Sequence, residues 1–171
     1  MSPYPDSIQS RLRRASQRLG LAHHEMARLA RLSETPLELD EHLPALSRGA
    51  FLHRIGEASR GPAAERRALC AITLHGPGPD LRLACQILNR DSRETDVVAR
   101  TGEAQFALLL KDCDEDGAWS AANRLGKKLT ESCVTASAFR GGHVTIAAAA
   151  LLDACSAASP LECLDERMRR L

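Results

Sequence analysis

The hydrophobic pattern of residues 7–32 is that of one long amphipathic helix, which Ser7 can cap. Its apolar residues recur at alternating spacings of four and three: Ile8, Leu12, Ala15, Leu19, Ala22, Met26 and Leu29. This narrow a/d seam is typical of a coiled coil. We therefore expect the helix to pair with a second copy of the chain and form a homodimer. The alternative is a helix that packs on its own domain.

A segment rich in proline and acidic residues follows the helix. Pro36 and Pro44 interrupt residues 33–46, which predicts a linker. We therefore divide the chain near residue 40. Residues 1–40 would hold the helix and linker, and residues 41–171 would form a larger domain.

Residues 47–93 predict a helix, a core strand and a second helix. Ser47 can cap the first helix, which ends before Gly61 and Pro62. An apolar, β-compatible run from Leu69 to His75 predicts the strand. A Gly-Pro-Gly-Pro connection then leads to a helix that begins at Asp80. The apolar positions of the two helices are Phe51, Leu52 and Ile55, and Leu81, Ala84, Cys85 and Leu88.

The middle of the chain predicts a β-hairpin and a further helix. Two apolar runs, 97–99 and 106–110, flank a turn at 101–104, as in a hairpin. Asp112 or Asp114 can cap the helix that follows. One side of this helix is apolar at Ala118, Ala122, Leu125 and Leu129.

The last third of the chain predicts one strand and one helix. A turn at Gly141 and Gly142 precedes a strand that begins at His143. The sequence from Ser159 to Glu162 is a capping box with proline at the first helical position. The helix it opens should bury Leu161, Leu164, Met168 and Leu171.

Composition excludes several classes of function. A net charge of +1 provides no bulk attraction to nucleic acid or membrane, and 3% aromatic residues argue against base stacking on single strands. No targeting segment and no run long enough to span a bilayer is visible, so we expect a cytoplasmic protein. The six cysteines form no C-x-x-C pair and fit reduced core thiols better than a zinc site or disulfides: Cys70, Cys85, Cys113, Cys133, Cys155 and Cys163.

The predicted hairpin and the residues just before it contain two short motifs at a fixed spacing. Arg93 and Asp96 form an Arg-x-x-Asp pair five residues before the turn Gly102-Glu103-Ala104-Gln105-Phe106. This stretch resembles the signature of the GGDEF (diguanylate cyclase) family, in which Arg-x-x-Asp precedes Gly-Gly-Asp-Glu-Phe by the same interval. The resemblance extends, in order, over about residues 41–171. It implies an α/β (α+β) domain of nucleotidyl-cyclase type, with a ferredoxin-like central sheet flanked by helices.

The residues that the family uses for catalysis are replaced. Thr73 and His75 stand where the first strand would carry the magnesium-binding aspartate, and neither is the hard anionic ligand that Mg²⁺ prefers. Glu103, Ala104 and Gln105 replace the second Gly, the Asp and the Glu of the signature. The short connection after His75 also leaves no room for the guanine-binding element of the family. We therefore expect no catalysis, no magnesium and no cofactor, with residual cyclase activity as an option that an assay with GTP would test.

The Arg-x-x-Asp pair implies a different function. In the family it is the inhibitory site for the product, cyclic di-GMP. Arg93 can donate two hydrogen bonds to guanine O6 and N7, and the Asp96 carboxylate can accept from N1 and N2. Arg124 matches a second family arginine, and Arg90 and Arg100 are nearby in sequence. Binding would bridge Arg93 and Asp96 of one protomer to an arginine such as Arg124 of another.

Two interpretations of this pair therefore remain. The chain is a cyclic di-GMP receptor, or Arg93 and Asp96 form an exposed ion pair of little energetic value. In the second case the domain is a ligand-free scaffold that regulates a protein partner. The receptor interpretation fails if the two side chains point apart or if the protein itself occupies them, and only the scaffold then remains.

Overall fold

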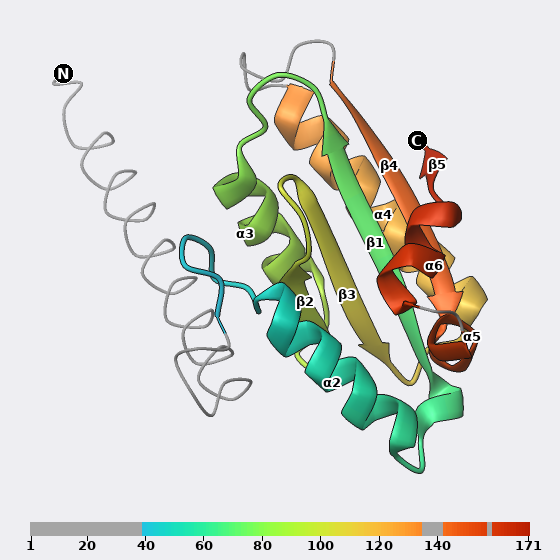
Figure 1. Ribbon diagram of the computed structural model, residues 1–171. Coiled ribbons are helices and arrows are strands. Elements are labelled where there is room, and N and C mark those ends of the chain that lie inside the picture. The colour runs from blue at the N-terminus through green and yellow to red at the C-terminus, as the bar shows by residue number, and fades with distance from the viewer. Residues whose placement is uncertain (1–38, 135–141, 157–158) are drawn as a thin grey trace, which may run out of the picture.

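The computed structural model describes residues 39–134, 142–156 and 159–171 (Figure 1). The predicted helix at 7–32, the first part of the linker and Gly141 lie outside the described residues. The described chain forms an α/β domain around one antiparallel sheet. Its strands are β1 (Arg67–His75), β2 (Val97–Arg100), β3 (Gln105–Lys111), β4 (His143–Ala150) and β5 (Arg169–Arg170), in the order β2-β3-β1-β4-β5.

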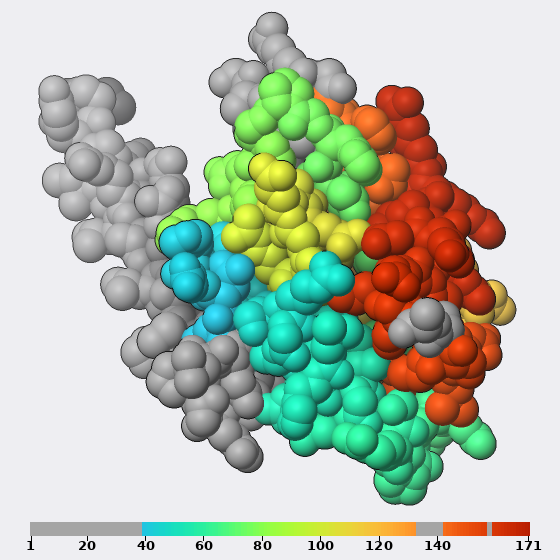
Figure 2. Space-filling view, in the orientation of Figure 1, coloured from blue at the N-terminus to red at the C-terminus, as the bar shows by residue number. Residues whose placement is uncertain are grey.

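Helices cover both faces of this sheet. They are α2 (Arg48–Arg60), the 3₁₀ turn η2 (Ala64–Arg66), α3 (Leu81–Asp91), α4 (Glu115–Val134), α5 (Leu151–Ser156) and α6 (Pro160–Glu166). One buried cluster joins the sheet to α3 and α4, and a second joins it to α2, α5 and α6. Figure 2 shows the second face, on which α2 lies next to the segment from α5 to β5. The predicted fold class is confirmed.

Local sequence signals set where the helices begin. Ser47 Oγ accepts a hydrogen bond from the Ala50 N–H at 3.2 Å and so caps α2. Asp80 caps α3 in the same way. Asp114, rather than Asp112, caps α4, since its Oδ1 accepts from the Gly117 N–H at 2.8 Å.

The predicted hairpin and the apolar side of α4 are also present. β2 and β3 pair antiparallel, with Val98 opposite Leu108. The four apolar residues predicted on α4 are all buried against the sheet. Because β1 is covered on both faces, it is apolar at successive positions rather than at alternate ones.

The described part of the predicted linker is instead packed against the sheet. Leu43, Ala45 and Leu46 are buried. The Leu46 N–H donates to Val98 O, and the Arg100 N–H donates to Leu46 O, so this segment covers the outer edge of β2. An exposed strand edge would otherwise present unpaired backbone groups.

The predicted C-terminal helix is wrong in its extent, and α5 was not predicted. Helix α6 buries Leu161 and Leu164 but ends at Glu166. The chain then turns and pairs β5 with β4, and the Leu171 N–H donates to Val144 O. Leu171 is therefore 40% exposed rather than buried. Its side chain lies over Gly126 of α4, where a Cβ atom would collide with it.

Candidate functional site

The antiparallel pairing of β1 with β3 separates the sequence-predicted residues into two groups. Thr73 pairs with Gln105, so the end of β1 and the hairpin turn share one end of the sheet, here called the turn end. Arg67 pairs with Lys111 at the opposite end. The Arg-x-x-Asp pair lies at this second end, here called the pocket end.

At the turn end, two arginines donate to carbonyls of the hairpin turn. Arg48 Nη1 lies 3.1 Å from Thr101 O. Arg100 Nε and Nη2 lie 3.2 Å and 2.9 Å from the carbonyl oxygens of Gly102 and Glu103. The remaining Arg100 nitrogen, Nη1, lies 3.5 Å from the Asp40 carboxylate. The backbone of the turn is therefore bound by the protein's own cations.

Gln105 holds the same turn from the other side. Its amide nitrogen donates to Asp165 of α6 at 2.7 Å, and its oxygen accepts from the Thr101 hydroxyl at 3.0 Å. A Cβ at Gly102 would lie 3.2 Å from the Gln105 Cβ, so the turn packs closely here. Ala104 contributes its carbonyl, which accepts from the Leu74 N–H. Together these contacts tie the turn to α6 and to β1.

The positions of the expected metal ligand do not fit Mg²⁺. The Thr73 hydroxyl oxygen is buried and has no hydrogen-bond partner among the described residues. His75 stacks on His143, with ring centroids 4.6 Å apart, and its Nε2 lies 2.8 Å from the Thr145 Oγ1. One neutral oxygen and an imidazole are a poor match to the anionic oxygen ligands that Mg²⁺ prefers. Desolvation, followed by the positive charge of Arg170 and by His75, lowers the pKa of His143.

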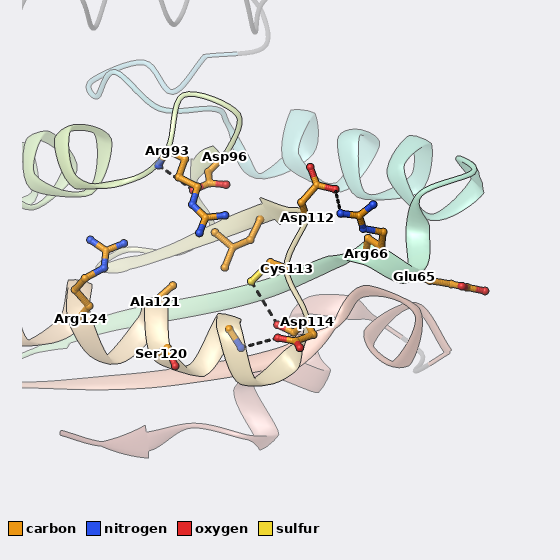
Figure 3. A pocket seen from close by; sticks show the side chains of 12 residues that line it. Glu65, Arg66, Arg93, Asp96, Asp112, Cys113, Asp114, Ser120, Ala121 and Arg124 are labelled. Atoms are coloured by element: carbon orange, nitrogen blue, oxygen red, sulfur yellow. Dashed lines mark hydrogen bonds and ion pairs between the residues drawn. The ribbon is translucent and has the colours of Figure 1, made fainter.

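The pocket end contains an open pocket of about 590 Å³ between the start of β1, the turn before β2, the end of β3 and the first half of α4. Its polar lining includes Arg66, Arg93, Asp96, Asp112, Cys113 and Arg124. Figure 3 shows the side chains of Arg93 and Arg124 directed into this space from different elements. Two guanidinium groups that face one cavity are suited to bind a phosphate or a guanine edge.

Asp96 holds the turn that carries Arg93. Its Oδ2 accepts from the Arg93 backbone N–H at 2.9 Å, and its Oδ1 lies 3.5 Å from the Lys111 backbone nitrogen. The Asp96 N–H in turn donates to Arg93 O. Asp96 lines the pocket but is only 4% exposed. Arg93 thus faces the pocket, whereas the Asp96 carboxylate is almost fully buried and already bonded to backbone N–H groups of the protein, which weighs against the receptor interpretation.

Arg124 reaches the pocket from α4 of the same chain. Its Nη1 donates to Asp91 O at 2.9 Å, which ties α4 to the end of α3. Arg124 therefore lines the same pocket as Arg93 within one chain, and the expected bridge to an arginine of another protomer stays a prediction. Arg90 does not line the pocket, because its guanidinium pairs with the Asp91 carboxylate at 2.8 Å. Arg100 lies at the turn end.

Asp91 also binds a second cation of α4. Its carboxylate accepts from Lys128 Nζ at 2.7 Å. Burial alone would raise the pKa of Asp91, but the hydrogen bonds from Arg90 and Lys128 outweigh it and lower the pKa below its usual value. Asp91 is therefore ionised at neutral pH and links α3 to α4 next to the pocket.

The lining residues that the sequence did not predict for this site include Arg66, Asp112 and Cys113. Arg66 precedes β1 and Asp112 follows β3, and only the register of these strands brings them together. Burial, and then the Asp114 carboxylate, raise the pKa of Cys113, although Arg93 acts in the opposite direction. Cys113 is thus a neutral thiol at neutral pH. The five described cysteines are thiols, and Cys70 and Cys85 are buried, as expected of core residues.

Comparisons with known proteins agree with this fold. No protein-family model and no curated protein sequence matches the chain. The GGDEF domain of FimX from Pseudomonas aeruginosa is 21% identical, with a TM-score of 0.50 over 79% of this chain and 88% of that one. A DGC protein from Thermotoga maritima is 17% identical, with a TM-score of 0.53 over 73% and 96%.

A third similar structure contains a nucleotide. The GGDEF domain of DgcB from Caulobacter crescentus, in complex with c-di-GMP, is 11% identical, with a TM-score of 0.53 over 79% of this chain and 88% of that one. The chain is therefore structurally similar to GGDEF diguanylate cyclase domains. Among the described residues, no helix is both long and apolar enough to cross a membrane.

Proposed function

We propose that this GGDEF-like domain does not synthesise cyclic di-GMP and instead acts as a receptor for it. The observation that carries the proposal is the convergence of Arg93, Asp96 and Arg124 on one pocket. The two guanidinium groups match the phosphates and the acceptor edge of guanine, and Asp96 matches the guanine donors. A carboxylate can accept several hydrogen bonds at once, so its backbone contacts and a guanine edge are compatible.

The absence of synthesis is supported by the chemistry of the turn end. Phosphoryl transfer needs a metal or an equivalent charge clamp on the transferring group. Thr73 and His75 are poor ligands for magnesium. The turn that would approach the triphosphate has three of its carbonyls bonded to arginine side chains, and Gln105 is bonded to Asp165. Cyclase activity would require all of these groups to be replaced or displaced.

Titration calorimetry with cyclic di-GMP tests the receptor proposal. We expect saturable binding that Arg93→Ala weakens at least about tenfold, because it removes a charge-assisted contact. Arg82→Ala is the matched control, since Arg82 is an exposed arginine of α3 that does not line the pocket. No heat of binding at high ligand concentration, or equal binding by the Arg93→Ala variant, would reject the proposal. A parallel incubation with GTP and Mg²⁺ should yield no product.

A ligand-free scaffold is the second candidate, and two observations favour it. The Asp96 carboxylate is already bonded to backbone N–H groups of the protein. Glu65, Asp112 and Asp114 also line the pocket and would oppose an anionic ligand. On this alternative the domain regulates a protein partner, and the calorimetric titration would show no binding of the nucleotide.

We also propose that the segment at residues 7–32 makes the protein a homodimer. The support is the a/d seam in the sequence. Sedimentation should show a dimer for the full-length chain and a monomer after residues 1–32 are removed. A monomeric full-length chain would reject this assignment.

A further inference from the structure

Arg66 and Asp112 form an ion pair on the side of the pocket away from Arg124. Arg66 ends η2 and Asp112 follows β3. Arg66 Nη2 lies 3.2 Å from Asp112 Oδ1, and the Cys113 N–H donates to Arg66 O, so backbone and side chains join the two segments. Figure 3 shows this pair at one side of the pocket, Arg124 at the other side and Arg93 between them.

This ion pair is weakly held. The side chains of Arg66 and Asp112 are 74% and 50% exposed. Ion pairs this exposed contribute little, because water competes for both partners. A phosphate offers several anionic oxygens and can take the place of one carboxylate beside a guanidinium. Arg66 can therefore exchange Asp112 for a ligand phosphate at small cost.

We propose that Arg66 is a third ligand-binding arginine of the pocket and that Asp112 is an internal competitor for it. The inference rests on the proposed function and identifies how the same site selects its ligand. A cyclic dinucleotide carries two phosphates on opposite sides of its ring. Arg93 would hold the guanine edge and Arg124 one phosphate, and Arg66, released from Asp112, would hold the other phosphate. A mononucleotide has only one phosphate and leaves the Arg66–Asp112 pair intact.

The test is therefore to compare the affinity for a ligand with two phosphates, cyclic di-GMP, with the affinity for a ligand with one phosphate, GMP. Arg66→Gln should weaken binding of cyclic di-GMP about tenfold, the loss of one charge-assisted hydrogen bond. Binding of GMP by the same variant should stay within about twofold of the unmodified protein, because its phosphate does not reach Arg66. A merely structural role of Arg66 would weaken both ligands equally.

Removing the competitor should have the opposite effect. Asp112→Asn should tighten cyclic di-GMP about threefold, as expected for the loss of an exposed ion pair. Asn is the appropriate substitution, since Asp112 has φ of +48° and Asn tolerates this left-handed backbone. The gain should vanish in the Arg66→Gln, Asp112→Asn double variant, because no guanidinium remains to be released.

Matched controls separate competition from general electrostatics. Arg82→Gln and Asp116→Asn make the same charge changes at exposed residues that do not line the pocket. Calorimetric titration of all six proteins at one ionic strength is the experiment, with both controls expected to bind within about twofold of the unmodified chain.

The results separate the two proposals. If Arg93→Ala, titrated beside these six proteins, weakens binding at least about tenfold while Arg66→Gln and Asp112→Asn bind normally, the present inference is overturned and the receptor proposal stands. The inference is equally overturned if Asp116→Asn tightens binding as much as Asp112→Asn, or if the gain persists without Arg66. If the unmodified protein binds no cyclic di-GMP, both proposals fail.

Discussion

The two ends of β1 use arginine in opposite ways. At the turn end, Arg48 and Arg100 donate to carbonyl groups of the hairpin turn. At the pocket end, Arg93 and Arg124 line an open cavity of about 590 Å³. At the turn end the arginines support the fold, whereas at the pocket end Arg93 faces the cavity and Arg124 both lines it and donates to Asp91 O. The surroundings of a guanidinium, and not its presence, decide whether it stabilises structure or can bind a ligand.

The largest expected effect comes from truncating an arginine at the turn end. Arg100 is 20% exposed and contacts Gly102, Glu103 and Asp40. Arg100→Ala should lower the free energy of unfolding by about 1–3 kcal/mol, because charge-assisted hydrogen bonds are lost and carbonyls lose their donors. Its affinity for cyclic di-GMP should be unchanged. Urea denaturation measures the first quantity and calorimetry the second.

Arg93→Ala should affect ligand binding and not stability, the reverse of the effect expected for Arg100→Ala. This variant should stay within about 0.5 kcal/mol of the unmodified protein in stability, as is usual for surface substitutions, while it loses binding. Equal losses of stability in the Arg93→Ala and Arg100→Ala variants would contradict the claim that the two ends of β1 use arginine differently.

A smaller effect is expected at the α3–α4 junction beside the pocket. The pKa of Asp91 is lower in the folded protein than its usual value, so the unfolded chain binds more protons at acidic pH. The stability that Asp91 contributes is therefore present above its usual pKa and is lost as the pH falls through the folded pKa. Asp91→Asn should reduce stability by less than about 1 kcal/mol at neutral pH.

Urea denaturation of this variant and the unmodified chain at a series of pH values measures that difference. The gap between them should shrink as the medium becomes acidic. A gap that is constant, or that grows towards low pH, would contradict the assigned direction of the pKa shift.

No gain of activity is expected when the turn alone is repaired. The variant Glu103→Gly, Ala104→Asp, Gln105→Glu restores the family turn, but Thr73, His75 and the short connection to α3 remain. Incubation with GTP and Mg²⁺ should yield no cyclic di-GMP by liquid chromatography. Product formation by this variant would show that the turn, and not the rest of the turn end, limits catalysis.

Much of the fold follows from short-range patterns. Ser47 and Asp80 cap the helices that their sequences predict, and the hairpin and the apolar side of α4 lie where predicted. Apart from the unpredicted helix α5, the errors involve backbone pairing between segments far apart in the sequence. Leu46 completes the edge of β2, and Arg169–Arg170 pairs with β4, although neither segment has the pattern of a strand. These two segments pair because β2 and β4 offer backbone hydrogen-bonding groups, and the local sequence of each segment does not indicate this.

The candidate site divides in the same manner. The sequence predicted that Arg93, Asp96 and Arg124 belong to one site, and all three line one pocket. The replacement of the family's catalytic acids stays a prediction from the resemblance. Only the tertiary structure decided that Arg100 belongs to the turn, that Arg90 pairs with Asp91, and that Arg66 meets Asp112 at the pocket. Side-chain identity is local information, whereas the partners of a charged group depend on strand register and helix packing. For this reason the type of each side chain could be read from the sequence, whereas the residues that it contacts could not.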